Sequence, residues 1–385
     1  MKYCHLALLI FLSFSSTYAG TTIKNIKKVG DGLYLMYYDT SAVKRTVSKS
    51  AIVEFKNYIV LLEMPIVYDN SDLTDHTAEG ENVMLALKTY FPHKPLKYII
   101  SSHWHPHSIS SVTPFITKGV TLITTRNNFK KISGFVDSAT YLKYRNNIMF
   151  MEDDSMVLKD KTNSIIIYKC KQSEYPYLPT EDFLYSYIPK NKCMQTSCMY
   201  QRLNGSKVRG KEMVSGRAEN LFQFVQSMQL MPQYYLCTEV YDDDQNGMIA
   251  ADTLQALLRN GIGMMSLESE LLNMSEETLA AKNDSLLKEY VLHPMPLSII
   301  NRAVYTALKN KELKRAMALA KLQALLNPAD PNSWDTYGET LYFSGDFKMA
   351  KRYELASKRI DKNYSDGGEK IWKQDLNDYQ QKWTK

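Results

Sequence analysis

The sequence predicts an α+β fold, in which a sheet-rich sandwich is followed by an all-helical region. Up to about residue 250, short segments rich in β-branched and aromatic residues alternate with helical patterns, in the order β, α, β, turn, β, hairpin, α, β. From about residue 250 the apolar residues keep a helical period, and no strand pattern follows. The two regions therefore belong to different structural classes.

Strands are predicted where a short apolar or aromatic run ends at turn residues. They lie at residues 33–38, 51–55, 58–62, 96–100, 120–124, 164–168, 183–188, 193–200 and 234–237. Lys56-Asn57 and the segment 189–192 suit hairpins between neighbouring strands. Helices are predicted over residues 80–91 and 221–230, where apolar residues recur at helical spacing.

The first residues have the pattern of an export signal. Lys2 precedes an apolar run from Leu6 to Phe14, and small or polar residues follow up to Ala19-Gly20. A membrane anchor is the alternative, but the run is much shorter than the roughly 20 residues that cross a bilayer. We therefore expect residues 1–19 to be removed and the protein to be secreted or periplasmic.

Length and charge limit the classes of function. The chain has 385 residues, 44% of them hydrophobic, and a net charge of +6. This length suits one large domain and a smaller one. Basic residues mostly stand beside acidic ones, as on a solvated surface, so we expect no nucleic-acid partner. After the signal we expect no membrane span.

The helical region has an internal period. Ala316 and Ala350 are separated by the length of one tetratricopeptide repeat, about 34 residues. Tyr337 and Glu354 depart from that repeat, whereas its tryptophan and small-residue positions are matched by Trp334, Gly338, Gly345, Ala350 and Ala356. An ordinary helical hairpin is the alternative. We predict a helical linker over residues 251–296 and tetratricopeptide-like repeats over residues 297–365.

Three histidines stand at alternate positions in a loop after an apolar strand, at His103, His105 and His107. Neutral imidazole is a strong zinc ligand, and side chains two apart in an extended segment point to the same side. The alternative is a polar surface loop that happens to be rich in histidine. The position at the end of a strand favours a metal site.

The histidine loop and its surroundings resemble the metallo-β-lactamase superfamily. Residues 91–124 are similar to the strand, His-x-His-x-Asp-His loop and following strand of that family. Residues 182–198 are similar to its later hairpin. Residues 221–237 are similar to the helix and strand that precede its last ligand. The resemblance covers about residues 25–250 and implies an αββα sandwich domain, which we place at residues 20–250.

Only part of the family's ligand set has a counterpart in this chain. His103 and His105 fall on its first two histidines, but His107 stands where the family has aspartate, unless a one-residue deletion places His107 on the third histidine. The other family positions carry Ser108 for the third histidine, Ser110-Ser111 for a glycine pair, Pro179 for the next histidine, Cys198 for the bridging aspartate, and Thr238 or Glu239 near the last histidine.

The resemblance therefore implies at most one metal ion. A hydrolase of this family needs a carboxylate that orients a metal-bound water, and neither alignment keeps it. The candidate ligands of a single zinc ion are His103, His105, His107 and Cys198, and four protein ligands would close the site and favour a structural role. No catalytic residue is assigned. In an oxidising compartment, two disulfides among Cys170, Cys193, Cys198 and Cys237 are the competing use of the thiols.

Three functions are compatible with these residues. The first is an exported family member with a degraded metal site, which binds a small molecule or a protein without catalysis. The second is a mononuclear zinc-dependent hydrolase. The third is a protein-interaction module in the helical tail, with the sandwich as its scaffold. An export signal, such a sandwich and such a tail together are typical of a bacterial protein.

Overall fold

A computed structural model describes residues 22–39, 48–64, 77–109, 111–132, 136, 138–240, 244–281, 283–292, 295–364 and 373. The predicted export signal lies outside these residues. The chain forms two compact units. The first unit consists of Met1–Tyr200 and Phe224–Ala251, and the second unit consists of Gln201–Gln223 and Asp252–Lys385. In the part of the chain that is described, no helix combines the length and the apolar character needed to cross a membrane.

The first unit contains a seven-stranded sheet whose strands lie side by side in chain order. The strands from β1 to β4 are antiparallel neighbours, and those from β4 to β7 are parallel. This arrangement brings the C-terminal ends of β4, β5 and β6 to one edge. The strands are β1 (Thr22–Gly30), β2 (Leu33–Asp39), β3 (Ser48–Glu54), β4 (Ile59–Leu62), β5 (Leu96–Ile100), β6 (Thr121–Thr124) and β7 (Ile148–Phe150).

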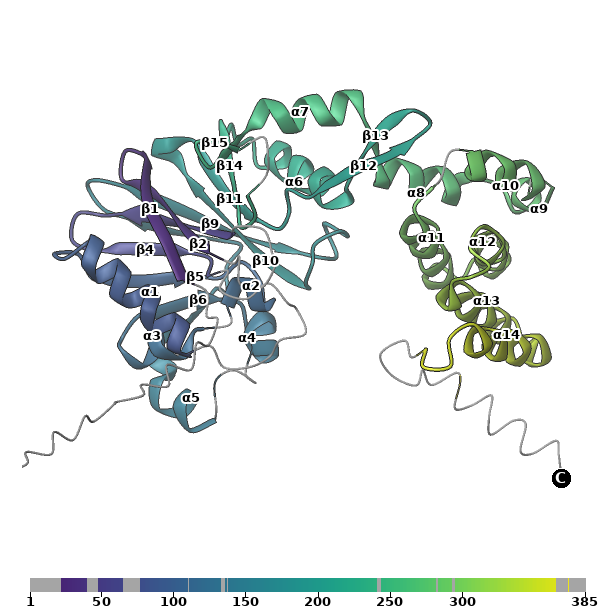
Figure 1. The fold of residues 1–385 in the computed structure, drawn as a ribbon, viewed down its shortest axis with the longest axis horizontal. Helices are drawn as coiled ribbons and strands as arrows, with labels where there is room; N and C mark the ends of the chain where they lie inside the picture. The colour runs from purple at the N-terminus through teal and green to yellow at the C-terminus, as the bar shows by residue number, and fades with distance from the viewer. Residues whose placement is uncertain are drawn as a thin grey trace, which may run out of the picture. The chain divides into compact units, whose positions relative to one another are not determined.

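Helices cover the outer face of this sheet (Figure 1). Side chains alternate along a strand, so Tyr34 and Met36 of β2 face outward, where they share a buried cluster with Val83 of α1, Phe115 of α3 and Phe129 of α4. The helices are α1 (Thr77–Tyr90), α2 (Pro106–Ile109), α3 (Thr113–Thr117), α4 (Arg126–Ile132) and α5 (Ser138–Tyr144), followed by the 3-10 turn η2 (Arg145–Asn147).

A second seven-stranded sheet, in the order β15-β16-β14-β11-β10-β9-β8, packs on the inner face of the first. Leu33 and Leu35 of β2 share their cluster with Ile167 and Leu184 of this sheet. On its other face Phe224 of α6 (Gly216–Ser227) stacks on Tyr185, with ring centroids 4.6 Å apart. The layers of the first unit are therefore helix, sheet and sheet, with the end of α6 from Phe224 onward on the far face of the second sheet. The strands are β8 (Ser155–Lys159), β9 (Ser164–Lys171), β10 (Asp182–Ile188), β11 (Cys193–Ser197), β14 (Tyr234–Cys237), β15 (Asp244–Gln245) and β16 (Met248–Ala250), with the 3-10 turn η3 (Pro189–Asn191) between β10 and β11.

The second unit is mainly helical. Its small sheet is made of β12 (Arg202–Val208), β13 (Lys211–Val214) and β17 (Ile262–Gly263), and Met213 shares a buried cluster with Leu267 and Leu271. The helices are α7 (Ala251–Asn260), α8 (Met264–Asn273), α9 (Glu276–Ala281), α10 (Asn283–Leu292), α11 (Leu297–Lys309), α12 (Leu313–Leu326), α13 (Pro331–Phe343) and α14 (Phe347–Ile360). The last four helices form two pairs, α11 with α12 and α13 with α14. The second pair repeats the first at a constant spacing along the chain, because the offset from α11 to α13 equals the offset from α12 to α14.

Most of the predicted elements are present, and the α+β class with a helical C-terminal region is confirmed. β5 and β14 have the predicted bounds, and the two predicted hairpins join β3 to β4 and β10 to β11. The β12–β13 hairpin has no predicted counterpart. Because β13 pairs with β17, Gln201–Gln223 belongs with the helical unit rather than with the sandwich domain predicted over residues 20–250.

Candidate functional site

The histidine loop, residues 101–107, begins where β5 ends, at the edge where the parallel strands of the first sheet terminate. Its backbone bends at residues 102–105, and α2 begins at Pro106. The extended backbone on which the expected common direction of the three histidines was based is therefore not present in this loop.

A buried carboxylate, Glu63, holds this loop against the sheet. Glu63 follows β4 and is 1% exposed. Its Oε1 accepts a hydrogen bond from the backbone N–H of Ser102 at 2.9 Å, and its Oε2 accepts one from the hydroxyl of Ser108. Burial raises the pKa of the Glu63 carboxyl to about 7, while the hydrogen bonds from Ser102 and Ser108 oppose that rise.

The backbone around Glu63 is also fixed by its neighbours. Glu63 has a φ of 65°, an uncommon value for a residue with a side chain, and its carbonyl accepts a hydrogen bond from the Ser50 hydroxyl at 2.8 Å. Sequence analysis did not identify Glu63 as a site residue. The signal for it was a single acidic residue directly after an apolar strand, at the sheet edge that also carries the histidine loop.

His103 is fully buried at the end of the first sheet. Its Nδ1 atom hydrogen-bonds the Ser102 hydroxyl at 2.7 Å, and its Nε2 atom lies 3.6 Å from the Sγ atom of Cys198. The ring also packs on Phe183 of β10, with centroids 5.4 Å apart. Both ring nitrogens of His103 are thus directed at named side chains.

His105 lies beside His103, and the two rings meet edge to face with centroids 4.6 Å apart. His105 is half-buried and also contacts Trp104 at 4.6 Å in the same geometry. The backbone of His107 lies in α2, whereas its side chain is outside the described part of the structure. Of the four predicted ligands, His103 therefore contacts both His105 and Cys198.

Cys198 reaches the histidine loop from the second sheet. It follows β11, and the preceding Ser197 has a φ of 48°, which ends the strand and turns the chain toward the loop. A backbone hydrogen bond also links the histidine loop to the second sheet, since the N–H of Leu184 in β10 donates to the carbonyl of Ser102 at 2.9 Å. The spacing between the two potential ligands is thus set by both sheets.

Four cysteines follow the predicted export signal, and all of them are free and buried. The Cys193 thiol donates to the carbonyl of Asn191 at 3.3 Å, and the Cys237 thiol lies 3.4 Å from the hydroxyl of Thr196. Burial raises the pKa of the Cys193 thiol to about 12 and moves the pKa of the Cys170 thiol higher still. The alternative of two disulfides is therefore not what the structure contains.

His103 and Cys198 have the spacing of two ligands of one zinc ion. Two tetrahedral zinc ligands, one sulfur and one nitrogen, stand roughly 3.5 Å apart, close to the 3.6 Å between Cys198 Sγ and His103 Nε2. A catalytic zinc ion needs three protein ligands. Among the residues that the structure describes, no three His, Cys, Asp or Glu side chains converge on a point where an ion could sit.

No protein-family model matches the chain, and no curated protein matches it by sequence. Solved structures that match include a metallo-beta-lactamase from Pontibacter korlensis (14% identity, 61% of this chain and 99% of that chain, TM-score 0.41) and the metallo-beta-lactamase FIM-1 from Pseudomonas aeruginosa in its mono-zinc form (10% identity, 62% and 94%, TM-score 0.42). A metallo beta lactamase from Hirschia baltica matches with 12% identity over 62% of this chain and 97% of that chain, at a TM-score of 0.39.

Proposed function

We propose that this chain is an exported, degenerate member of the metallo-β-lactamase superfamily that binds a small molecule or a protein partner and does not hydrolyse substrates. The single observation that carries the proposal is the set of residues at the family's ligand positions: His107 stands at the aspartate, and Pro179 and Thr238 or Glu239 stand at later histidines. The helix–sheet–sheet layering and the sequence resemblance around the histidine loop support the family assignment. The export pattern of residues 1–19 supports a secreted or periplasmic location.

At the matching sequence position, this chain also lacks the family's carboxylate that would orient a nucleophilic water. The family's aspartate position carries His107. The buried carboxylate that touches the loop in the described structure is Glu63, and its two oxygens accept hydrogen bonds from Ser102 and Ser108. Glu63 therefore acts as a structural support of the loop. A carboxylate engaged in this way is not directed at a substrate.

A hydrolysis assay tests this proposal. The mature protein and His103→Ala are incubated with excess zinc and with ester, thioester and β-lactam substrates. We expect both proteins to give the same background rate. Turnover by the wild type that is lost in His103→Ala would refute a non-catalytic role.

A mononuclear zinc-dependent hydrolase is the second candidate, favoured by the 3.6 Å distance between His103 Nε2 and Cys198 Sγ. In that case either His105 or His107 would supply the third protein ligand, and the zinc held by three ligands would polarise a water molecule at its open position. This candidate predicts about one zinc ion per chain after purification without added metal. A metal-free protein whose melting temperature does not change in zinc would count decisively against it.

The helical tail is the proposed site of a protein partner. The common offset of its two helix pairs equals the length of a tetratricopeptide repeat, about 34 residues, and supports a tetratricopeptide-like arrangement. Trp334 of α13 stacks on Tyr353 of α14 with centroids 5.3 Å apart, which ties the second pair together. If a partner is identified, deletion of residues 297–385 should abolish its binding, and retained binding would show that the partner uses the sandwich instead.

A further inference from the structure

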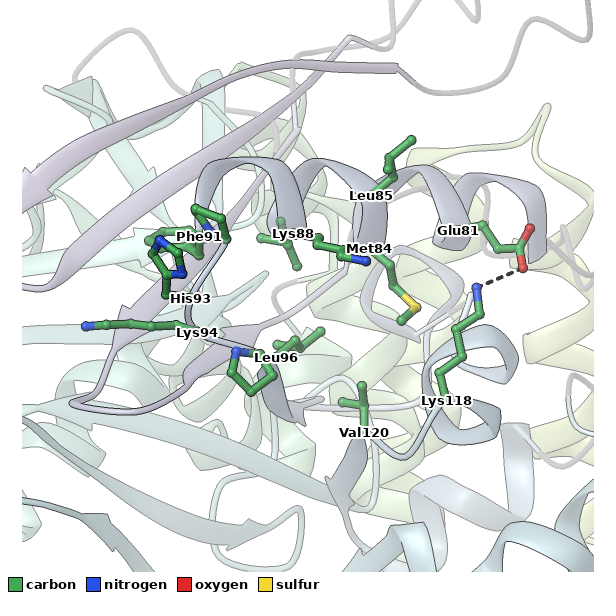
Figure 2. Close-up of a pocket in the computed structure, with 13 residues that line it drawn as sticks. Glu81, Met84, Leu85, Lys88, Phe91, His93, Lys94, Leu96, Lys118 and Val120 are labelled. Atoms are coloured by element: carbon green, nitrogen blue, oxygen red, sulfur yellow. Dashed lines mark hydrogen bonds and ion pairs between the residues drawn. The ribbon is translucent and has the colours of Figure 1, made fainter.

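The first unit contains a cavity at the opposite end of β5 from the histidine loop. It has a volume of about 640 Å³ and lies between α1, the segment Phe91–Leu96 and the start of β6 (Figure 2). Pockets that bind small molecules usually have volumes of roughly 300 to 1,000 Å³. All of its lining residues belong to the same compact unit.

The wall of this cavity is apolar and continuous with the protein core. Leu87, Phe91 and Val120 are 2%, 7% and 3% exposed, and they belong to the buried cluster beneath the helices. Met84 and Leu96 are half-buried and pack against the same cluster. The wall is therefore held in place by core packing, and it offers an apolar ligand a preformed surface.

The rim of the cavity is basic. Three lysines line it, and two of them have acidic partners: Lys94 pairs with Glu54 at 2.7 Å, and Lys118 pairs with Glu81 at 3.1 Å. Lys88 makes no ion pair with any residue that the structure describes, and Figure 2 shows its side chain extending beside Met84. Within the described structure, its ammonium group thus lies next to the apolar wall without a counter-charge.

We propose that this cavity binds a single-chain fatty acid, with the carboxylate on Lys88 and the aliphatic chain along Met84, Leu96 and Val120. The pairing of an uncompensated cation with an apolar wall is complementary to an amphiphile that has one negative charge. A peptide fits less well, because its backbone N–H and C=O groups would lie unpaired against the apolar wall. A lipid bilayer fits less well, because a flat surface cannot fill a concave site.

Titration of the full mature protein with dodecanoate, below the concentration at which it forms micelles, tests the proposal. We expect saturable one-to-one binding by calorimetry, at least tenfold weaker binding of dodecanol, and weaker binding of dodecanoate at high salt because salt screens the ammonium charge. Lys88→Gln should weaken dodecanoate binding at least tenfold. The matched control is Lys159→Gln, since Lys159 is an exposed lysine on β8 of the same unit.

A second variant of the cavity wall and a binding measurement with lipid vesicles complete the test. Met84→Gln should also weaken dodecanoate binding while its melting temperature stays near that of the wild type. Cys198→Ser changes the ligand pair with almost no change in side-chain volume and should bind dodecanoate normally, so failure of this proposal is distinguishable from failure of the proposed function. Equal affinity of Lys88→Gln and Lys159→Gln would overturn the proposal. Binding to vesicles of phosphatidylglycerol and phosphatidylcholine, without binding of monomeric dodecanoate, would overturn it in favour of a membrane surface.

Discussion

The Nε2 atom of His103 and the Sγ atom of Cys198 lie 3.6 Å apart, although the two residues are separated by 95 positions in the chain. His103 follows a strand of the first sheet and Cys198 follows a strand of the second. Their contact therefore marks the point where the edges of the two sheets meet. The same contact has the length of a hydrogen bond to sulfur and the spacing of two zinc ligands.

Removal of the His103 ring should destabilise the first unit. The ring is fully buried, contacts Phe183 and hydrogen-bonds the Ser102 hydroxyl. His103→Ala leaves a cavity and removes those interactions, so we expect the free energy of unfolding to fall by about 2 to 4 kcal/mol. Urea unfolding followed by circular dichroism measures this. His93→Ala removes an exposed histidine and should change stability by less than about 0.5 kcal/mol; an equal loss in both variants would contradict the packing described for His103.

The stability of the first unit should fall between about pH 4.5 and pH 7 because of Glu63. Its pKa is raised by burial from 4.5 to about 7 in the folded protein. In this pH window the carboxyl of Glu63 stays protonated in the folded state but is ionised in the unfolded state. The contribution of Glu63 to the free energy of unfolding is therefore complete below pH 4.5 and is lost as pH rises toward 7. The total is about 3 kcal/mol, since each pKa unit corresponds to about 1.4 kcal/mol.

Glu63→Gln isolates that contribution. The amide cannot ionise, so the variant should lack the fall in stability between pH 4.5 and pH 7 that unfolding at a series of pH values detects in the wild type. Glu219 is a useful comparison, because burial also raises its pKa to about 7 but it lies in the second unit. Glu219→Gln should leave the pH dependence of the first unit unchanged. A flat pH profile of the wild type would show that Glu63 is ionised in the folded state at low cost.

Thiol counting should find four free cysteines in the mature protein. Cys170, Cys193, Cys198 and Cys237 are buried, and none is joined to another. A thiol reagent should therefore react slowly with the native protein and with four groups per chain after unfolding in denaturant without reductant. Cys198→Ser should reduce that number to three. No free thiol after unfolding would establish two disulfides instead.

Local sequence patterns predicted the strands and hairpins well where burial alone determines them. Leu96–Ile100 and Tyr234–Cys237 are short apolar runs between turn residues, and the structure keeps both bounds. The β12–β13 hairpin escaped prediction because its strands are weakly apolar. Its turn, at Arg209 and Gly210 with φ values of 53° and 75°, was the available signal.

The candidate site was predictable only in part, because it depends on contacts between distant segments. The resemblance to a known family brought His103 and Cys198 into one hypothesis, and the structure places them in contact. The alternation of the histidines suggested a common direction, which requires an extended backbone, but the loop bends at residues 102–105 and enters α2 at Pro106. Glu63 was missed because only the sheet topology shows that the end of β4 lies beside the end of β5.

The central proposal is that His103 and Cys198 hold no resident metal ion in this protein. The zinc content of the mature protein, purified without added metal or chelator, tests it most directly. The account predicts well below one zinc ion per chain, with no difference between the wild type and a His103→Ala, Cys198→Ser double variant. About one zinc ion per wild-type chain, absent from the double variant, would contradict it.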